Sequence, residues 1–180
     1  DDHPRAMELL RDSQDRIRSM SFIHESLYQT KNFSHVDLAT YIDGLSRNLM
    51  MSYSLSGKVD LVKDLEPVEL VLDQAIPCGL ILNELISNAL KHAFPEGAAG
   101  TIHLSLHARD QHVEILVEDD GPGLPEGFDA ERDANLGLQL VDTLIGQLDG
   151  RIERRTASIG HGKGVGYFLT FERTGIIKQA

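Results

Sequence analysis

The segment from Asp73 to Ala93 constrains the fold of this chain more than any other feature. Its apolar residues recur at helical spacing, Asp73 is a residue type that caps helix N-termini, and a cluster of Pro95, Gly97 and Gly100 directly after it stops a helix. The runs on both sides of this helix are short and rich in β-branched residues, which is typical of strands. A long helix between strand runs has to bury its apolar side against a sheet, which predicts a fold of the α+β class.

Strand and helix patterns continue on both sides of that helix. We predict a two-layer sandwich with a mixed, mainly antiparallel sheet, helices on one face of it, and a long N-terminal helix that stands apart. The runs 58–65 and 68–72 indicate either two strands or one hairpin with Pro67 in its bend. The runs 101–109 and 112–120 indicate a hairpin in the centre of the sheet. The remaining predictions are helices over 4–28, 37–53 and 136–148, strands over 150–157 and 165–172, a connection over 31–35, and a loop over 121–134.

The composition narrows the classes of partner. A formal net charge of -11 argues against a nucleic-acid partner, because neutralising phosphates needs clustered Lys and Arg. The one cysteine, Cys78, lies in an apolar run, so no disulfide forms within the chain, and a buried thiol fits the reducing cytoplasm. No uncharged apolar stretch approaches the roughly 20 residues of a membrane span. We therefore expect a cytoplasmic chain with no nucleic-acid partner and no membrane segment.

One side of the 73–93 helix carries polar side chains that suit a nucleotide triphosphate. At roughly 100° per residue, Glu84, Asn88, Lys91 and His92 fall within about 100° of one another. An amide oxygen is a ligand for magnesium, a lysine supplies charge to phosphate oxygens, and a carboxylate can orient or deprotonate an attacking group. An ordinary solvated helix face explains the same pattern. The opposite side is expected to pack on the sheet through Leu82, Leu85, Ile86, Ala89 and Ala93.

Three glycine-containing segments follow this helix in order. In VEDDGPG an apolar strand ends in Asp119, whose carboxylate can accept a hydrogen bond from an amine such as that of adenine, and Gly121 and Gly123 let the backbone approach a ligand. NLGLQLV places Gly137 at a helix start, where free N–H groups attract phosphate. GHGKGVGYFLTF places Gly164 before the last strand. A β-turn or close packing explains each segment alone, whereas their succession favours a nucleotide site.

Together these segments resemble the ATP-binding domain shared by gyrase, heat-shock chaperone, histidine kinase and MutL proteins, the Bergerat fold, over about residues 74–172. NELISNALKHA resembles the N box, EDDGPG the first glycine box and NLGLQLV the second, and the loop between the glycine boxes resembles a shortened ATP lid. The resemblance implies ATP and Mg²⁺ as ligands, with Asn88 as the metal ligand and Asp119 on the adenine amine. It implies catalytic roles for Glu84, Asn88 and Lys91, and nucleotide contacts by Asn88, Lys91, His92, Asp119, Gly121, Gly123, Leu136, Gly137 and Gly164.

Residues 5 to 45 carry a second resemblance, to a particular group of histidine kinases. RDSQDRIRSMSFIHESLYQ and VDLATYIDGL are similar to the second dimerisation helix and the linker of histidine kinases related to the HWE group. This similarity implies a partial dimerisation domain over 1–33 and a catalytic and ATP-binding domain over 34–180. It further implies three partners: ATP, a response regulator, and the protein's own dimerisation domain, with a homodimer in the full-length protein.

The histidine that accepts phosphate in such kinases lies in a motif like HHRVKN, which this chain does not contain. His24 lies at helical spacing with Ile17, Met20 and Leu27, so we expect it to pack in a helix seam rather than to accept phosphate. The accepting histidine is therefore expected outside this chain. The implied function is transfer of the γ-phosphoryl group of ATP to that histidine, for relay to an aspartate of the response regulator.

Three other functions use the same residues. An ATP hydrolase would use Glu84 to activate water, a serine kinase of the anti-sigma-factor type would modify a partner protein, and a nucleotide-binding scaffold would have no activity. The chain also departs from the family pattern. It has no Trp, Glu84 stands where many histidine kinases have Asn, and Val165 stands where the third glycine box has Thr. Arg132 in the lid is expected to be a solvated charge rather than a contact of the γ-phosphate.

Overall fold

The computed structural model describes residues 35–53, 58–95, 98–124, 136–160 and 163–175. Seven further residues between 7 and 25 are described, and all seven are helical and exposed. The rest of the predicted helix over 4–28, and the predictions for His24 and Arg132, lie outside the described residues. The described residues in the leading segment are Met7, Leu10, Ser13, Gln14, Ile17, Ser21 and Glu25, and Gly127 is described in the lid region.

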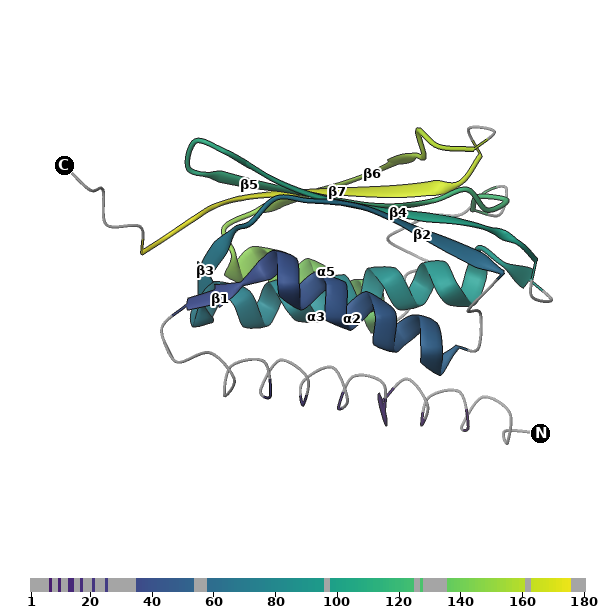
Figure 1. Ribbon diagram of the computed structural model, residues 1–180, viewed down its shortest axis with the longest axis horizontal. Coiled ribbons are helices and arrows are strands. Elements are labelled where there is room, and N and C mark those ends of the chain that lie inside the picture. The colour runs from purple at the N-terminus through teal and green to yellow at the C-terminus, as the bar shows by residue number, and fades with distance from the viewer. Residues whose placement is uncertain are drawn as a thin grey trace.

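A five-stranded sheet forms one layer of the molecule (Figure 1). Its outer strand β2 pairs with β4 in parallel, and every other neighbouring pair in the described part of the sheet is antiparallel. The predicted hairpin of β4 and β5 is confirmed, and both strands are internal. A short antiparallel pair, β1 (His35–Asp37) with β3 (Glu69–Val71), lies outside this sheet. In spatial order the five strands are β2 (Val59–Leu65), β4 (Gly100–Arg109), β5 (His112–Asp119), β7 (Val165–Glu172) and β6 (Arg151–Thr156).

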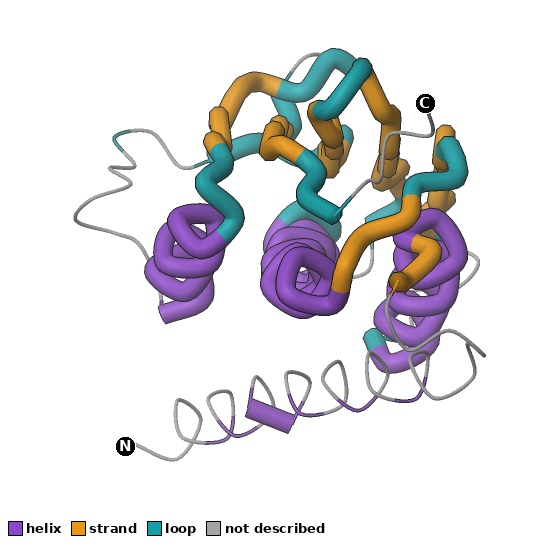
Figure 2. The backbone as a smooth tube through the Cα atoms, turned by 90° about the vertical axis from the view of Figure 1, so that its left-hand side faces the viewer, coloured by secondary structure: helices purple, strands orange, loops and turns teal. Residues whose placement is uncertain are grey.

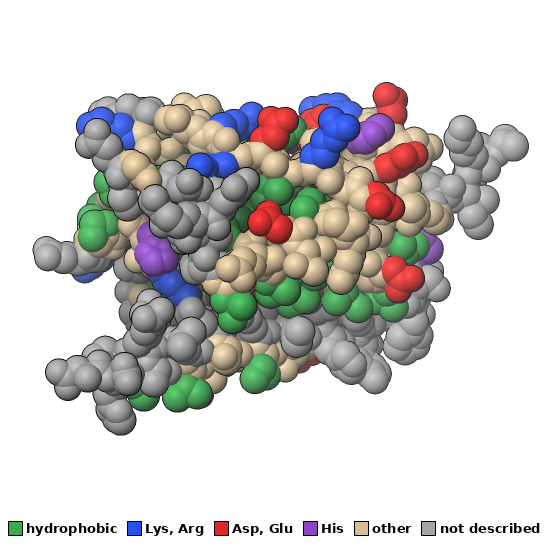
Figure 3. Space-filling view, turned by 180° about the vertical axis from the view of Figure 1, so that it is seen from behind, with side chains coloured by type: hydrophobic (Ala, Val, Ile, Leu, Met, Phe, Trp, Pro, Cys, Tyr) green, Lys and Arg blue, Asp and Glu red, His purple; other side chains and the backbone are tan. Residues whose placement is uncertain are grey.

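In the part of the chain that the structure describes, three helices form the second layer: α2 (Leu38–Ser52), α3 (Leu72–His92) and α5 (Leu136–Gln147). They lie side by side beneath one face of the arched sheet, with α3 in the middle and in contact with the other two (Figure 2). Seen from behind, charged side chains gather along the sheet, and hydrophobic side chains show toward the helical layer (Figure 3). The predicted α+β sandwich, with a mixed, mainly antiparallel sheet and helices on one face, is confirmed.

For residues 58–72, the sequence left open either two separate strands or one hairpin. A β2–β3 hairpin is wrong, because β2 pairs with β4 and β3 pairs with β1. Glu66 N–H still donates to Leu106 O of β4 at 2.9 Å, and Val68 O accepts from Leu38 N–H at 2.8 Å. Pro67 between them has no N–H to donate, so the chain leaves one sheet and joins the other pair at this residue. The connection predicted over 31–35 gives way to β1 at its last residue.

The two long helices begin in different ways. Asp37 caps α2, since its Oδ1 accepts a hydrogen bond from Ala39 N–H at 3.1 Å. The prediction that Asp73 caps α3 is wrong, because the helix begins at Leu72 and Val71 is the capping residue, without a side-chain hydrogen bond. Asp73 lies in the first turn instead, where a negative charge is favourable near the helix N-terminus.

The core lies between α3 and the inner face of the sheet. From Cys78 to Ser87 every residue of α3 is buried, because α2 and α5 cover its flanks and the sheet covers its top. The fully buried residues include Ile81, Leu82, Leu85 and Ile86 of α3, Ile102, Leu104 and Leu106 of β4, and Phe171 of β7. No helix in the described part of the chain is long and apolar enough to span a membrane.

Gln74 fastens the end of β7 to the beginning of α3. Its Nε2 donates to Glu172 O at 2.8 Å and its Oε1 accepts from Thr174 N–H at 3.0 Å. We expect Gln74→Ala to lower the free energy of unfolding by about 1–2 kcal/mol, since two hydrogen bonds of a 7% exposed side chain are lost. Urea denaturation measures this change. Gln147→Ala, at the exposed end of α5, is the control and should change stability by less than about 0.5 kcal/mol; equal losses in the two variants would contradict the assigned role.

Candidate nucleotide-binding site

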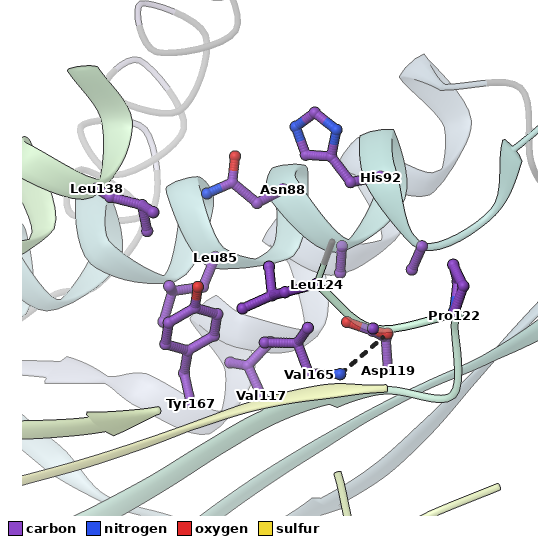
Figure 4. A pocket seen from close by; sticks show the side chains of 13 residues that line it. Leu85, Asn88, His92, Val117, Asp119, Pro122, Leu124, Leu138, Val165 and Tyr167 are labelled. Atoms are coloured by element: carbon purple, nitrogen blue, oxygen red, sulfur yellow. Dashed lines mark hydrogen bonds between the residues drawn. The ribbon is translucent and has the colours of Figure 1, made fainter. Parts of the chain in front are cut away.

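A cavity of about 490 Å³ opens between α3 and the ends of β5 and β7 (Figure 4). This volume lies within the range of about 300–1,000 Å³ that is usual for small-molecule sites. Residues from α3, β5, the loop after β5, α5 and β7 form its wall, so segments far apart in the sequence meet here. They are Leu85, Asn88, Ala89, His92, Ala93, Val117, Asp119, Pro122, Gly123, Leu124, Leu138, Val165 and Tyr167.

Polar groups lie on two facing sides of this mainly apolar cavity (Figure 4). Asp119 lies on the sheet side, at the end of β5, whereas Asn88 and His92 extend from α3 (Figure 4). Most other side chains of the wall are aliphatic, for example those of Leu85, Val117 and Leu124. Such a cavity can take a flat apolar group that has a hydrogen-bonding edge at one end and a charged or metal-bound group at the other.

Asp119 is the carboxylate of the cavity and is 5% exposed. Its Oδ1 accepts hydrogen bonds from Gly121 N–H at 3.0 Å and from Val165 N–H at 3.3 Å, whereas Oδ2 accepts none from the residues that the structure describes and can serve a ligand. Burial raises the pKa of Asp119, and the nearby charges of Asp120 and Glu118 raise it further, although the two backbone hydrogen bonds oppose this. The site therefore holds a desolvated hydrogen-bond acceptor in a fixed orientation.

Glycines allow three chain segments to meet around Asp119. A Cβ on Gly164 would lie 2.6 Å from the carbonyl carbon of Asp119, and a Cβ on Gly121 would lie 2.7 Å from the carbonyl oxygen of Ala93. Both distances are shorter than any normal contact, so a side chain at either position would push the segments apart. Gly123 has a φ of 84°, a conformation that glycine adopts without steric cost. These glycines thus shape the cavity through packing and backbone conformation.

The cavity brings together four of the predicted site residues: Asn88, His92, Asp119 and Gly123. Gly121, Gly137 and Gly164 lie beside lining residues without lining the cavity themselves. Leu136 is 61% exposed and is not part of the wall, although Leu138 of the same helix is. Four of the predicted residues therefore converge on the cavity, and three others are sequence neighbours of residues that line it.

Glu84 and Lys91 are placed differently from the expectation. Glu84 is 7% exposed and Lys91 is half-buried, and neither lines the cavity. Leu85, Ala89 and Ala93, which were predicted to pack on the sheet, belong to the hydrophobic core and also form part of the cavity wall, together with Asn88 and His92. The cavity thus lies over the border between the polar and apolar sides of α3, not over the centre of the polar side. The roles of Glu84 and Lys91 remain predictions.

Among the remaining wall residues, the sequence patterns pointed to Val165, as a departure from the family's Thr, but not to Val117, Leu124, Leu138 or Tyr167. Val117 lies two residues before Asp119, and Tyr167 lies two residues after Val165, so strand alternation puts them on the same inner face of the sheet. This alternation is the sequence signal that would have identified them. Leu138 follows directly after Gly137, and Leu124 follows Gly123. Burial raises the pKa of Tyr167, whose hydroxyl belongs to an otherwise mainly aliphatic wall. Val165, which stands where the family has Thr, contributes its backbone N–H to Asp119.

Known structures share this fold. The histidine kinase domain of a blue-light-activated histidine kinase of Erythrobacter litoralis superposes with a TM-score of 0.77 at 21% sequence identity, covering 89% of this chain and 74% of that one. The mycobacterial sensor histidine kinase MprB superposes with a TM-score of 0.62 at 20% identity, covering 79% of this chain and 98% of that one. At these identities the likeness concerns the fold alone.

Two proteins that resemble the chain in sequence are histidine kinases. The sensor histidine kinase PdtaS of Mycobacterium tuberculosis is 32% identical over 154 residues, which are 83% of this chain and 30% of that protein. Blue-light-activated histidine kinase 2 of Erythrobacter litoralis is 33% identical over 90 residues, 49% of this chain and 26% of that protein. The chain thus spans about a third or less of the length of these relatives.

Two family descriptions match consecutive parts of the chain. Residues 1–53 match the family described as "Histidine kinase". Residues 73–174, more than half of the chain, match the family described as "Histidine kinase-, DNA gyrase B-, and HSP90-like ATPase". The second match contains every residue of the cavity wall. The chain therefore belongs to the histidine kinase-, DNA gyrase B- and HSP90-like ATPase family, and the relatives and solved structures named above are histidine kinases.

Proposed function

We propose that this chain binds ATP with Mg²⁺ in the described cavity and acts as the catalytic and ATP-binding part of a histidine kinase. The reaction is transfer of the γ-phosphoryl group to a histidine of a dimerisation domain, for relay to an aspartate of a response regulator. One observation carries the proposal: Asp119 and Asn88 line the same cavity although they come from different layers of the fold. The family of the chain and the apolar wall between these two residues support it.

Asp119 is proposed to bind the adenine base. Its Oδ1 is occupied by two backbone N–H groups, and its Oδ2 is suited to accept a hydrogen bond from the exocyclic amine. The aliphatic side chains of Val117, Leu85 and Leu124 would lie against the faces of the ring. Gly121 and Gly123 are proposed to contribute by shaping this end of the cavity.

The phosphates are proposed to lie at the α3 end of the cavity. Asn88 supplies an amide oxygen, which is a suitable ligand for the Mg²⁺ that accompanies ATP, and His92 lies one turn further along the wall. Gly137 lies in the first turn of α5, where backbone N–H groups favour anions, and Leu136 and Lys91 are proposed as further contacts of the phosphates. Gly164, which packs against Asp119, is proposed as a contact near the base. Bound Mg²⁺ would neutralise charge on the phosphate oxygens, and the protein would position the γ-phosphoryl group.

The proposed division assigns residues 1–33 to part of a dimerisation domain and 34–180 to the catalytic domain. Within this proposal the full-length protein is a cytoplasmic homodimer, and the accepting histidine is supplied by a dimerisation domain. The match of residues 1–53 to the histidine kinase family supports this organisation. The hydrolase alternative loses support, because the one carboxylate proposed to activate water, Glu84, does not line the cavity.

Incubation with Mg²⁺ and γ-labelled ATP, in the presence of a supplied dimerisation domain that carries an HHRVKN-like motif, tests the proposal. We expect label that is lost in acid and retained in base, as for phosphohistidine. Label that resists acid would indicate a hydroxyl acceptor and a serine kinase instead. Steady release of phosphate that disappears in Glu84→Gln, without any labelled protein, would indicate a hydrolase.

A further inference from the structure

A buried carboxylate lies on the opposite face of the sheet from the cavity, next to Asp119 in sequence. Glu118 is 1% exposed. Its Oε2 accepts from Ser158 N–H at 2.7 Å, its Oε1 accepts from the Ser158 hydroxyl at 2.8 Å, and His103 Nδ1 lies 3.2 Å from Oε1. Ser158 follows β6, and His103 lies on β4, so Glu118 joins three separate segments of the chain.

Glu118 is held in its charged form. Burial alone raises the pKa of a carboxyl group, but the hydrogen bonds from Ser158 and from His103 outweigh this and hold the pKa of Glu118 below its ordinary value. Hydrogen bonds to an ionised acceptor are about twice as strong as those between neutral groups. The contact of Glu118 with Ser158 is therefore a strong attachment of the segment after β6 to the central strand β5.

The same segment is attached to β5 a second time from the other face of the sheet. Glu118 and Asp119 are consecutive, so their side chains point to opposite faces. Glu118 holds Ser158, and Asp119 Oδ1 accepts from Val165 N–H at 3.3 Å. A hydrogen bond from Ala157 N–H to Gly164 O, 2.9 Å long, joins the two attachment points. Movement at Ser158 would therefore be transmitted to Val165.

This segment also packs directly on the chain that leaves β5. A Cβ on Gly160 would lie 2.5 Å from Cβ of Asp120, and a Cβ on Gly164 would lie 2.6 Å from the carbonyl carbon of Asp119. A Cβ on Gly123 would collide with the carbonyl oxygen of Lys163. With so little free space, the position of the segment fixes the position of the cavity wall at Asp119 and Gly123.

We infer that Glu118 is a positioning residue of the nucleotide site, which holds Ser158 on the outer face of the sheet so that Val165 N–H is presented to Asp119. The inference rests on the proposed function, because it assigns to Glu118 an effect on nucleotide affinity. It adds a residue that touches neither the cavity nor the nucleotide. Asp119 is orientated by Val165, and Val165 is orientated through Ser158 by Glu118.

Glu118→Gln tests this inference, with affinity measured by calorimetry for ATP and for ADP in the presence of Mg²⁺. The amide of Gln carries no charge and has one acceptor oxygen instead of two, so the hydrogen bonds to Ser158 lose their charge assistance and we expect affinity to fall by about fivefold or more. The factor should be equal for ATP and ADP, since both carry the base proposed to meet Asp119. Loss of a negative charge near a polyanion would by itself increase affinity, so the sign of the change distinguishes positioning from simple electrostatics.

Glu114→Gln is the matched control. Glu114 lies on the same outer face of the same strand, four residues before Glu118, and has no hydrogen bond to Ser158. Its substitution by Gln therefore removes the same charge as Glu118→Gln does. We expect its affinity for ATP to equal that of the unaltered chain or to exceed it slightly. An equal loss of affinity in Glu114→Gln, or an unchanged affinity in Glu118→Gln, would overturn the inference.

Variants of Ser158 separate positioning from general loss of structure. Ser158→Ala loses the hydroxyl but keeps the backbone N–H, so it should weaken binding in part, whereas Ser158→Thr keeps the hydroxyl and should bind as the unaltered chain does. Glu118→Gln should cost less affinity in the Ser158→Ala background than it does alone. Hydrogen exchange of the Val165 amide in the nucleotide-free protein should accelerate in Glu118→Gln while the other β5–β7 amides keep their rates. Unchanged exchange at Val165 would overturn the inference even if affinity changed. Absence of ATP binding by the unaltered protein would instead refute the proposed function.

Discussion

Replacing Asp119 by Asn is expected to weaken ATP binding at least about 100-fold, or about 2.7 kcal/mol, with little change in fold. If the amide oxygen keeps the hydrogen bonds from Gly121 and Val165, the amide nitrogen takes the place of Oδ2. A donor then faces the donor of the adenine amine, and the described residues of the cavity wall include no other carboxylate. Calorimetric titration with ATP and Mg²⁺ measures the change. An affinity within about threefold of the unaltered chain would contradict the proposed binding of the base.

The stability of this variant separates a binding defect from unfolding. Burial raises the pKa of Asp119 in the folded protein above its value in the unfolded chain, so the ionised carboxylate destabilises the fold at all pH values above the folded pKa. This cost disappears as the pH falls through that pKa. At neutral pH, Asp119→Asn should therefore be as stable as the unaltered chain or more stable. Asp120→Asn is the control, because Asp120 accepts from Thr101 N–H at 2.7 Å and does not line the cavity; it should retain ATP affinity.

Gly164→Ala is expected to lower both stability and affinity. The added Cβ would overlap the backbone of Asp119, and neither strand can move without breaking the β5–β7 ladder. We expect a loss of about 2–3 kcal/mol in the free energy of unfolding and at least about tenfold in ATP affinity. Urea denaturation and calorimetry measure the two effects.

Gly146→Ala provides the comparison for that substitution. Gly146 lies on the exposed side of α5, and a Cβ there would meet nothing within 4 Å. Because Ala favours a helix over Gly by up to about 1 kcal/mol, this variant should be more stable and should bind ATP as before. If both alanine variants behave alike, close packing at Gly164 does not explain its role.

Periodic patterns predicted the elements that span many residues. The helix α3, the β4–β5 hairpin and the final strands all have enough turns or alternations to be recognised from sequence. The three-residue strand β1 does not, and its pairing with β3 depends on a contact between segments more than 30 residues apart. Likewise, whether the two strands around Pro67 pair with each other or with β4 and β1 depends on the tertiary fold, and the local sequence does not determine it.

The candidate site was predictable in its residue types but not in its orientation. A helical wheel groups Glu84 with Asn88 and His92, yet it does not fix how α3 is rotated relative to the sheet. Packing of Leu82 and Ile86 against the core sets that rotation, and it takes Glu84 out of the cavity wall. The contact of Glu118 with Ser158 spans 40 residues and carries no local motif, so only the folded chain reveals it.

The position of α3 has a consequence for how ligand selectivity can diversify. Ala89 and Ala93 belong at once to the hydrophobic core and to the wall of the cavity, so a larger side chain at either position would disturb the interior of the whole domain. Leu124, which is 40% exposed, and Leu138 at the start of α5 carry no such double constraint. Substitutions at these two leucines should therefore alter the shape of the cavity at a smaller loss of stability than substitutions on its helix side.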